Sequence, residues 1–307
     1  MTRQSTSQRA AWIALFAVGA MSLGACSSLR TSASGVAIDT VPIAPIVAGT
    51  YAPTVSPPPT LAPTTHLPPP TTEETTTTVA ETTTTVPANI VVVGAFPVPI
   101  VAVEKSSGPD TAVAQLRLLQ LGFWNSSADG DYGLTTKQAV MAFQKYIGLE
   151  ATGSLDANTA AFLTGTEVRA HGQADEGTLV EVDKARQLLF LVIDGKTEWV
   201  FNTSTGNGLP YEERDQNSPG SPLIKGVALT PDGLWTVNRQ RSDGWWDGDL
   251  GSIYRPKYFR GGIAVHGSNS IPNYPASHGC VRVSVPAMDF IWATDLVPLD
   301  TTVWVHG

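Results

Sequence analysis

One segment near the carboxyl end combines residue types that could carry out acyl transfer. It runs Ser277-His278-Gly279-Cys280-Val281-Arg282, and the dipeptide His266-Gly267 precedes it. A thiol with an ordinary pKa of about 8.5 is mostly protonated at neutral pH, so a nucleophilic cysteine needs a base or a cation beside it. It also needs N–H groups that face the developing oxyanion. The segment offers two imidazoles, a thiol, and a glycine that leaves room for a tight turn.

The two histidines differ in how they can reach the thiol. His278 lies two residues before Cys280, so in an extended chain both side chains would share a face. His266 is expected to end a separate strand and to approach from across the sheet, which suits proton abstraction better. We therefore expect His266 to be the base. The other histidines have no such context and stay unassigned: His66, His171 and His306.

The same side chains permit a second interpretation. His266, His278 and Cys280 could in principle ligate zinc, as in a metallopeptidase. However, His278 and Cys280 belong to one tight turn, and no carboxylate pattern accompanies them. We therefore predict neither a metal nor an organic cofactor.

Short apolar runs predict that strands position this segment. Asp194-Gly195 is typical of a hairpin turn, and residues 206–226 are expected to be a long surface loop. Many short strands indicate a β-sandwich or a partly open barrel. Strands are predicted at 179–182, 188–193, 198–202, 227–230, 234–237, 262–265, 281–285 and 302–305, with a helix at 286–293.

Six aromatic residues in this region could wall a cleft or could simply pack in the core. They are Trp235, Trp245, Trp246, Tyr254, Tyr258 and Phe259.

A helical region, residues 109–166, precedes the strands. Its first helix is expected to be capped by Asp110 or Thr111 and to end at Gly122. A second should begin at Thr135, with Gln138 as its capping partner, and a third should follow Asp156. The expected inward-facing residues are Val113, Leu116 and Leu119, then Val140, Phe143 and Ile147, then Ala160 and Leu163.

Residues 26–108 are expected to be a disordered tether rich in proline and threonine. Thirteen of the 23 prolines lie between Pro42 and Pro99, whereas seven of the eight tryptophans follow residue 108. Such a composition buries too little apolar surface to offset chain entropy. An extended tether would hold a folded body away from a membrane.

The amino terminus has the pattern of an export signal. Two arginines precede an apolar run that is shorter than a membrane span. The run ends in Leu23-Gly24-Ala25-Cys26, which resembles a bacterial lipobox and predicts a signal peptide over residues 1–25 and lipid on Cys26. An ordinary signal peptide with a chance cysteine is the alternative. With Cys26 lipidated, Cys280 is the only thiol left in an exported chain and has no disulfide partner.

Charge narrows the classes of partner. The chain of 307 residues has a formal net charge of −8 and no basic cluster. This argues against nucleic acid as a partner and against electrostatic docking on anionic lipid.

Two resemblances to known families follow from these motifs. The Ser-His-Gly-Cys-x-Arg segment, with His266 before it, resembles the signature of the L,D-transpeptidase (YkuD-like) family. The resemblance spans residues 178–307 and includes Ser204-Thr205-Gly206 and Thr230-Pro231-Asp232-Gly233. The ten-residue spacer between His266 and Ser277 is shorter than usual in the family. Residues 109–166 resemble a three-helix peptidoglycan-binding domain, although a bundle that only spaces the next domain is the alternative.

The resemblance implies a role for each residue of the motif. Cys280 would be the nucleophile and His266 the general base, which the carbonyl of Gly267 would orient. Arg282 would hold a substrate carboxylate, a role that its planar fork suits, or it could be a plain surface residue. The oxyanion hole and its support would comprise Ser277, His278, Gly279 and the amide of Cys280.

The implied protein is multidomain: a small all-α wall-binding domain followed by a mainly-β, sandwich-like catalytic domain. It would cross-link peptidoglycan through an acyl-enzyme formed on a tetrapeptide stem. An L,D-carboxypeptidase that uses water as acceptor and a non-catalytic wall-binding lipoprotein are the alternatives. The expected partners are stem peptides, glycan, and a membrane reached through the lipid anchor. The expected location is outside the cell membrane, facing the wall or periplasm.

Overall fold

The computed structural model describes residues 89–307. The expected signal peptide, the lipidated Cys26 and most of the tether lie outside the described residues. Within them, the helical and β regions belong to one compact unit. No helix in residues 89–307 combines the length and the apolar character that crossing a bilayer requires.

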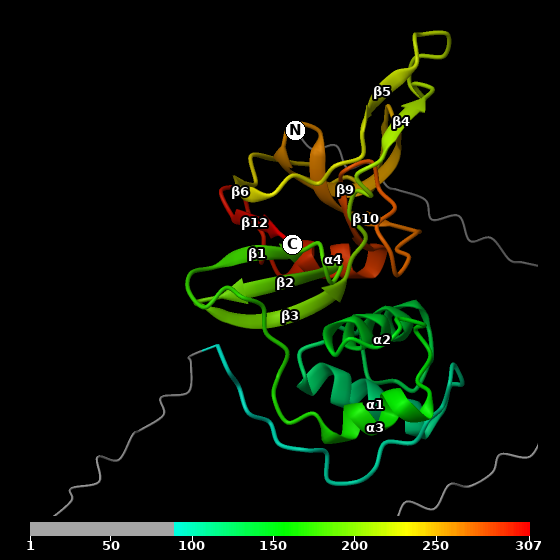
Figure 1. The fold of residues 1–307 in the computed structure, drawn as a ribbon, viewed down its shortest axis with the longest axis vertical. Helices are drawn as coiled ribbons and strands as arrows, with labels where there is room; N and C mark the ends of the chain where they lie inside the picture. Colours follow the sequence, from blue (N-terminus) through cyan, green and yellow to red (C-terminus); the bar gives the residue numbers. More distant parts are fainter. Residues whose placement is uncertain (1–88) are drawn as a thin grey trace, which may run out of the picture. The chain divides into compact units, whose positions relative to one another are not determined.

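Three helices come first along the chain (Figure 1): α1 Pro109–Gln120, α2 Leu134–Tyr146 and α3 Ala157–Gly165. Glycines precede α1 and α2, so the expected caps at Asp110 or Thr111 and at Thr135 are wrong. Proline is tolerated at Pro109 because the N–H groups in the first turn of a helix have no carbonyl partner within the helix, so the missing N–H of proline costs no hydrogen bond. The cap of α3 is confirmed, since the side chain of Asp156 accepts from the amide of Thr159.

The buried face of α1 differs from the expected one. Val113 and Leu116 are 37% and 46% exposed, whereas Ala114, Gln115 and Leu118 are buried. The polar side chain of Gln115 points inward instead. It accepts a hydrogen bond from the backbone amide of Gly130 and donates one to the carbonyl of Asp131. The buried side-chain amide is stable there because the turn before α2 provides its hydrogen-bond partners.

The first sheet has the order β3-β2-β1-β12-β6, with β1 and β12 parallel and the other pairs antiparallel. Asp194-Gly195 makes the tight turn from β2 to β3, and both residues have positive φ, as the sequence predicts. The strands are β1 Leu179–Asp183, β2 Leu188–Ile193, β3 Lys196–Asn202, β6 Gly233–Thr236 and β12 Thr302–His306.

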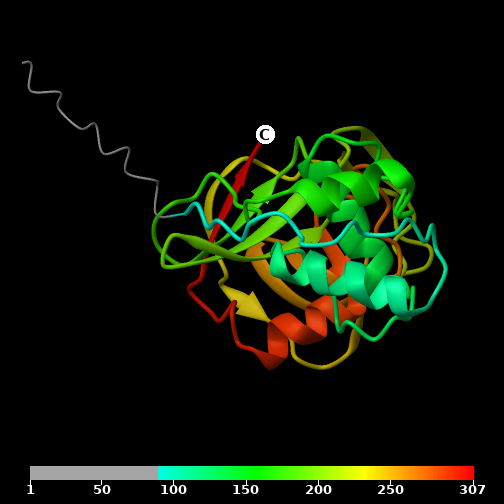
Figure 2. The same ribbon diagram turned by 90° about the horizontal axis from the view of Figure 1, so that it is seen from below.

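Strand β2 is apolar throughout because both of its faces are covered. Leu188, Phe190 and Val192 join the core beneath the three helices, and Leu189 and Leu191 join the core on the other side of the sheet. A strand buried on both faces has a continuous apolar run instead of alternation. Figure 2 looks onto the three helices with the strands behind them.

The second sheet positions the Ser-His-Gly-Cys segment. Its order is β11-β10-β9-β7, β8 adds to β9, and β10 and β11 are parallel. The helix α4 Val285–Ala293 packs on this sheet and completes the second core. The strands are β7 Arg239–Gln240, β8 Trp245–Gly248, β9 Gly251–Arg260, β10 Ile263–Ser268 and β11 Val281–Ser284. Of these, β7 to β9 were not expected from the sequence.

Two expectations about irregular segments are corrected. Residues 206–226 contain most of a hairpin, β4 Pro210–Glu213 with β5 Ile224–Val227, instead of a plain loop. Residues 89–107, expected to belong to the tether, lie against the helices. Ile100 is buried among them, and backbone bonds join this segment to Leu155 and to 164–167. The segment has few apolar side chains, but they can be buried because the helices provide the apolar surface against which they pack.

Candidate active site

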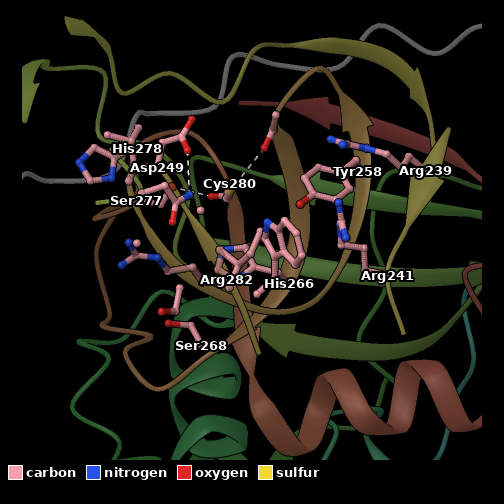
Figure 3. Close-up of a pocket in the computed structure, with 18 residues that line it drawn as sticks. Arg239, Arg241, Asp249, Tyr258, His266, Ser268, Ser277, His278, Cys280 and Arg282 are labelled. Atoms are coloured by element: carbon pink, nitrogen blue, oxygen red, sulfur yellow. Dashed lines mark hydrogen bonds between the residues drawn. The ribbon is translucent and has the colours of Figure 1, made fainter. Parts of the chain in front are cut away.

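Adjacent parallel strands bring the expected site residues together. Cys280 directly precedes β11 and His266 lies in β10, where it pairs in register with Arg282. All three line one cavity of about 410 Å³. Figure 3 shows Cys280 between Arg282 and His278 on one side and Arg239, Arg241 and Tyr258 on the other.

His266 is built to remain neutral. It is 3% exposed, and its Nδ1 lies 2.8 Å from the carbonyl oxygen of Gly267. Burial lowers the pKa of His266 to about 4. Since a neutral imidazole bound to a carbonyl carries its proton on that nitrogen, Nε2 is left as an acceptor.

Cys280 is a half-buried thiol. Burial raises its pKa, although the Ala264 backbone and the charge of Arg282 act in the opposite direction. The sulfur lies 3.8 Å from the carbonyl oxygen of Gly262. The thiol therefore keeps its proton at neutral pH until a base removes it.

A turn at Gly279 presents Cys280 to the cavity. Gly279 has φ +136°, and a Cβ there would lie 2.8 Å from the Leu229 carbonyl oxygen, so only glycine fits. Ser277 Oγ accepts from the Gly279 amide at 3.0 Å and donates to the Cys280 carbonyl at 2.5 Å. The Gly279 amide is thus occupied, contrary to expectation. Within residues 89–307, the His278 and Cys280 amides donate to no oxygen of the chain.

The side chain of His278 turns away from the thiol. Its Nε2 lies 2.8 Å from Glu213 Oε1 on β4, and its ring contacts Tyr211 with centroids 4.8 Å apart. The expectation that His278 and Cys280 share a face is wrong because the positive φ of Gly279 breaks the extended chain between them.

Arg282 is fixed through its backbone. Its amide and carbonyl pair with Ser204, at 3.1 and 3.3 Å, and Thr203 Oγ1 donates to the same carbonyl at 2.7 Å. The side chain is left to line the cavity beside Cys280.

Two family models match this chain. The description "L,D-transpeptidase catalytic domain" matches residues 177–305, and "Putative peptidoglycan binding domain" matches residues 107–163. The crystal structure of an L,D-transpeptidase from Xylanimonas cellulosilytica is 44% identical, with 68% of this chain and 99% of that chain covered and a TM-score of 0.60. The chain belongs to the L,D-transpeptidase family. Both matched domains point to peptidoglycan, which indicates an exported protein that faces the cell wall.

Two weaker similarities complete the comparison. An L,D-transpeptidase from Stackebrandtia nassauensis is 22% identical over 66% of this chain and 92% of that chain, with a TM-score of 0.36. The N-acetylmuramoyl-L-alanine amidase CwlM of Mycobacterium tuberculosis is 38% identical over 65 residues, 21% of this chain. The chain spans 16% of the length of that curated relative.

Several residues of this L,D-transpeptidase-family site were missed at the level of sequence. Thr230 Oγ1 donates to the Gly279 carbonyl at 2.7 Å and accepts from the Gly206 amide, so it ties two loops to the cysteine turn. The Thr-Pro-x-Gly turn was the available signal. Glu213, Arg239 and Arg241 carried no signal, because their importance depends on tertiary contacts.

Some of the six aromatic residues line the cavity, and others pack in the core. Trp246 and Tyr258 line the cavity, whereas Phe259 belongs to the core. Trp245 packs on Tyr254, with ring centroids 5.3 Å apart.

The zinc alternative lacks a suitable set of ligands in the described region. Among residues 89–307, no three His, Cys, Asp or Glu side chains gather closely enough to hold a metal ion. His278 is directed at Glu213 and not toward the thiol.

Proposed function

We propose that this chain is an L,D-transpeptidase that acylates Cys280 with a peptidoglycan stem peptide, with His266 as the general base. One observation carries the proposal. The imidazole of His266, whose Nδ1 is bound to Gly267 and whose pKa is lowered, lines the same cavity as the thiol of Cys280, whose pKa is raised and which directly precedes the neighbouring strand β11. A protonated thiol needs such a base to become a nucleophile.

The first step forms a thioester. His266 Nε2 takes the thiol proton while Sγ attacks the carbonyl carbon at the L-centre of the diamino acid in a tetrapeptide stem. The His278 and Cys280 amides, free of other acceptors in residues 89–307, stabilise the oxyanion. When the intermediate collapses, its C–N bond breaks, and the imidazolium gives the proton to the departing D-alanine amine.

The second step transfers the acyl group. The amine of a second stem attacks the thioester carbon and loses a proton to His266. The carbon–sulfur bond breaks, and the sulfur regains its proton from the imidazolium. The net reaction exchanges one amide for another, so it needs neither an oxidant nor a cofactor.

Arg282 binds a substrate carboxylate in this proposal. Its backbone is held on both sides by Ser204 and Thr203, so the guanidinium projects from a fixed point. A planar guanidinium binds a carboxylate through two parallel hydrogen bonds. Residues 109–166 would bind the glycan or stem and hold the catalytic domain on its polymeric substrate.

The location follows from the leader and tether. We propose export, lipidation of Cys26 and membrane anchoring, with the proline-rich segment between anchor and enzyme. Mass analysis of the mature amino terminus tests this: a diacylglyceryl group on Cys26 supports it, and an unmodified or differently cleaved terminus rejects it.

Product analysis tests the proposed reaction. Purified wild-type chain and Cys280→Ala are incubated with disaccharide tetrapeptides, and products are separated by mass. We expect cross-linked dimers from the wild type and none from Cys280→Ala. Trimmed monomers without dimers would assign carboxypeptidase activity instead, and equal products from both proteins would reject a cysteine mechanism.

A further inference from the structure

The cavity contains a second cationic site that the proposed mechanism leaves unused. Arg239 and Arg241 line it together with Cys280, on the opposite side from Arg282 in Figure 3. Arg239 lies in β7, and Arg241 directly follows it, where its amide still pairs with the carbonyl of Pro256 at 3.0 Å. Because side chains alternate along such an extended chain, both arginines lie on the same side of it. Gln240 turns the other way, where its Oε1 accepts from buried Lys257 at 3.0 Å.

Stacking holds both guanidinium groups in place. The Cζ of Arg239 lies 3.8 Å from the ring centre of Tyr258, and that of Arg241 lies 3.6 Å from the ring centre of Trp246. A guanidinium stacked on an aromatic face keeps its edges available for hydrogen bonds. The two groups are therefore preorganised for a planar anion.

Neither arginine has a carboxylate partner. The ion pairs found in residues 89–307 include neither of them. The Nε of Arg241 is shielded from solvent and has no hydrogen-bond partner there. Arg239 is exposed, and its Nη2 donates to the Gly261 carbonyl at 3.4 Å. Because the unpaired, buried Nε of Arg241 costs free energy, and because two like charges repel each other, an anion bound between the two guanidinium groups would stabilise them.

We propose that Arg239 and Arg241 form a subsite for a second substrate carboxylate, the one on the side chain of the diamino acid whose carbonyl reacts. This rests on the proposed function and refines it. In the donor stem, the carboxylates nearest the reacting carbonyl are the terminal one and this side-chain one. Arg282 binds the first, and Arg239 and Arg241 bind the second, with Cys280 between them.

The subsite predicts selection by charge. A donor that carries the side-chain carboxylate pairs with both guanidinium groups, whereas its carboxamide analogue leaves them without an anion. Sites built to pair a buried polar group discriminate strongly against a ligand that lacks it. The chain should therefore prefer the free acid, even though its own net charge is negative.

The test compares two tetrapeptides that differ only by carboxylate or carboxamide at that position. Acylation rates are measured by intact mass for the full-length chain, for Arg239→Gln/Arg241→Gln, and for Arg260→Gln. Arg260 is a matched control because it stacks 4.7 Å over Trp235 but does not line the cavity. We expect the wild type and the control to favour the acid at least ten-fold, and the double variant to lose that preference.

A binding measurement separates this inference from the proposed function. Calorimetry with Cys280→Ala measures peptide affinity without turnover. The double arginine change in that background should raise the dissociation constant of the acid at least ten-fold and leave that of the amide unchanged. Equal loss for both peptides, or no loss, overturns the subsite. Acid-selective binding without any acylation by the wild type would keep the subsite and reject the proposed reaction.

Discussion

At the scale of single residues, the candidate reacting pair is uncharged before substrate arrives. Burial lowers the pKa of His266 to about 4 and raises that of Cys280. Burial thus disfavours the charged form of each group, which favours a neutral resting pair over a thiolate–imidazolium pair. In the proposed mechanism, proton transfer accompanies attack on the carbonyl, and the proposed oxyanion donors stabilise the charge that forms.

The pH dependence of alkylation tests this resting state. Iodoacetamide reacts with thiolate, so modification of Cys280 should be slow at pH 6 and should rise about ten-fold per pH unit without a plateau below pH 9. The measurement follows the peptide that contains Cys280 by mass spectrometry, with glutathione as the reference thiol. Fast modification with a plateau near pH 6 would reveal a preformed thiolate and contradict the neutral pair.

At the scale of elements, the β4–β5 hairpin reaches the cysteine turn. Glu213 on β4 binds His278 at 2.8 Å, and Tyr211 packs on the same imidazole. The loop between β4 and β5 also contacts the β8–β9 turn, where the amide of Asn217 donates to Asp249 at 2.9 Å. The hairpin therefore connects the two edges of the cavity and restrains the residue directly before Gly279.

Glu213→Gln tests this restraint. The substitution weakens a partly exposed pair, so stability should change by only about 0.2–1 kcal/mol. The acylation rate should fall several-fold, because the amide of His278 then moves relative to the carbonyl oxygen. Glu212→Gln is the control, since Glu212 pairs with Lys225 inside the hairpin. Equal rates for both variants would show that the hairpin does not position the turn.

The sequence predicted elements best where side chains act locally. Asp156 capped its helix, and Asp194-Gly195 made its turn. The parallel pairing that places His266 inside β10, on the strand next to the cysteine segment, was not predicted. The predicted buried face of α1 was wrong because the side chain of Gln115 is buried there, where it accepts a hydrogen bond from Gly130 in a turn 15 residues further along the chain. The long strand β9 has no alternating pattern, since only its second half is buried. Contacts of this kind depend on tertiary packing, which no short window of sequence contains.

At the scale of the whole described unit, the helices support the catalytic region directly. Lys145 on α2 donates to the carbonyls of Gln187 and Thr203, each at 3.2 Å, and Thr203 also holds Arg282. Gln138 accepts from Asn202 on β3 at 2.6 Å. These contacts extend to the strands that position the site, so the helices pack against the catalytic region as well as preceding it in the chain.

Lys145 makes this junction sensitive to pH. Burial lowers its pKa to about 7 from 10.5, so between those values the unfolded chain binds more protons and stability rises with pH. Relative to Lys145→Met, the wild type should gain up to about 1.4 kcal/mol per pH unit between pH 7 and 10. Urea unfolding measures this, with exposed Lys137→Met as the control. Parallel curves for wild type and Lys145→Met would contradict the buried amine.

The most direct test of the central claim is the mass of the peptide that contains Cys280 after the full-length chain meets a tetrapeptide stem. We expect a gain equal to the mass of the stem without its D-alanine, located on Cys280. We also expect that His266→Ala, otherwise folded, acquires this mass about 10²–10⁴-fold more slowly. An adduct on another residue, or a His266→Ala chain that is acylated at the wild-type rate, would contradict the central claim.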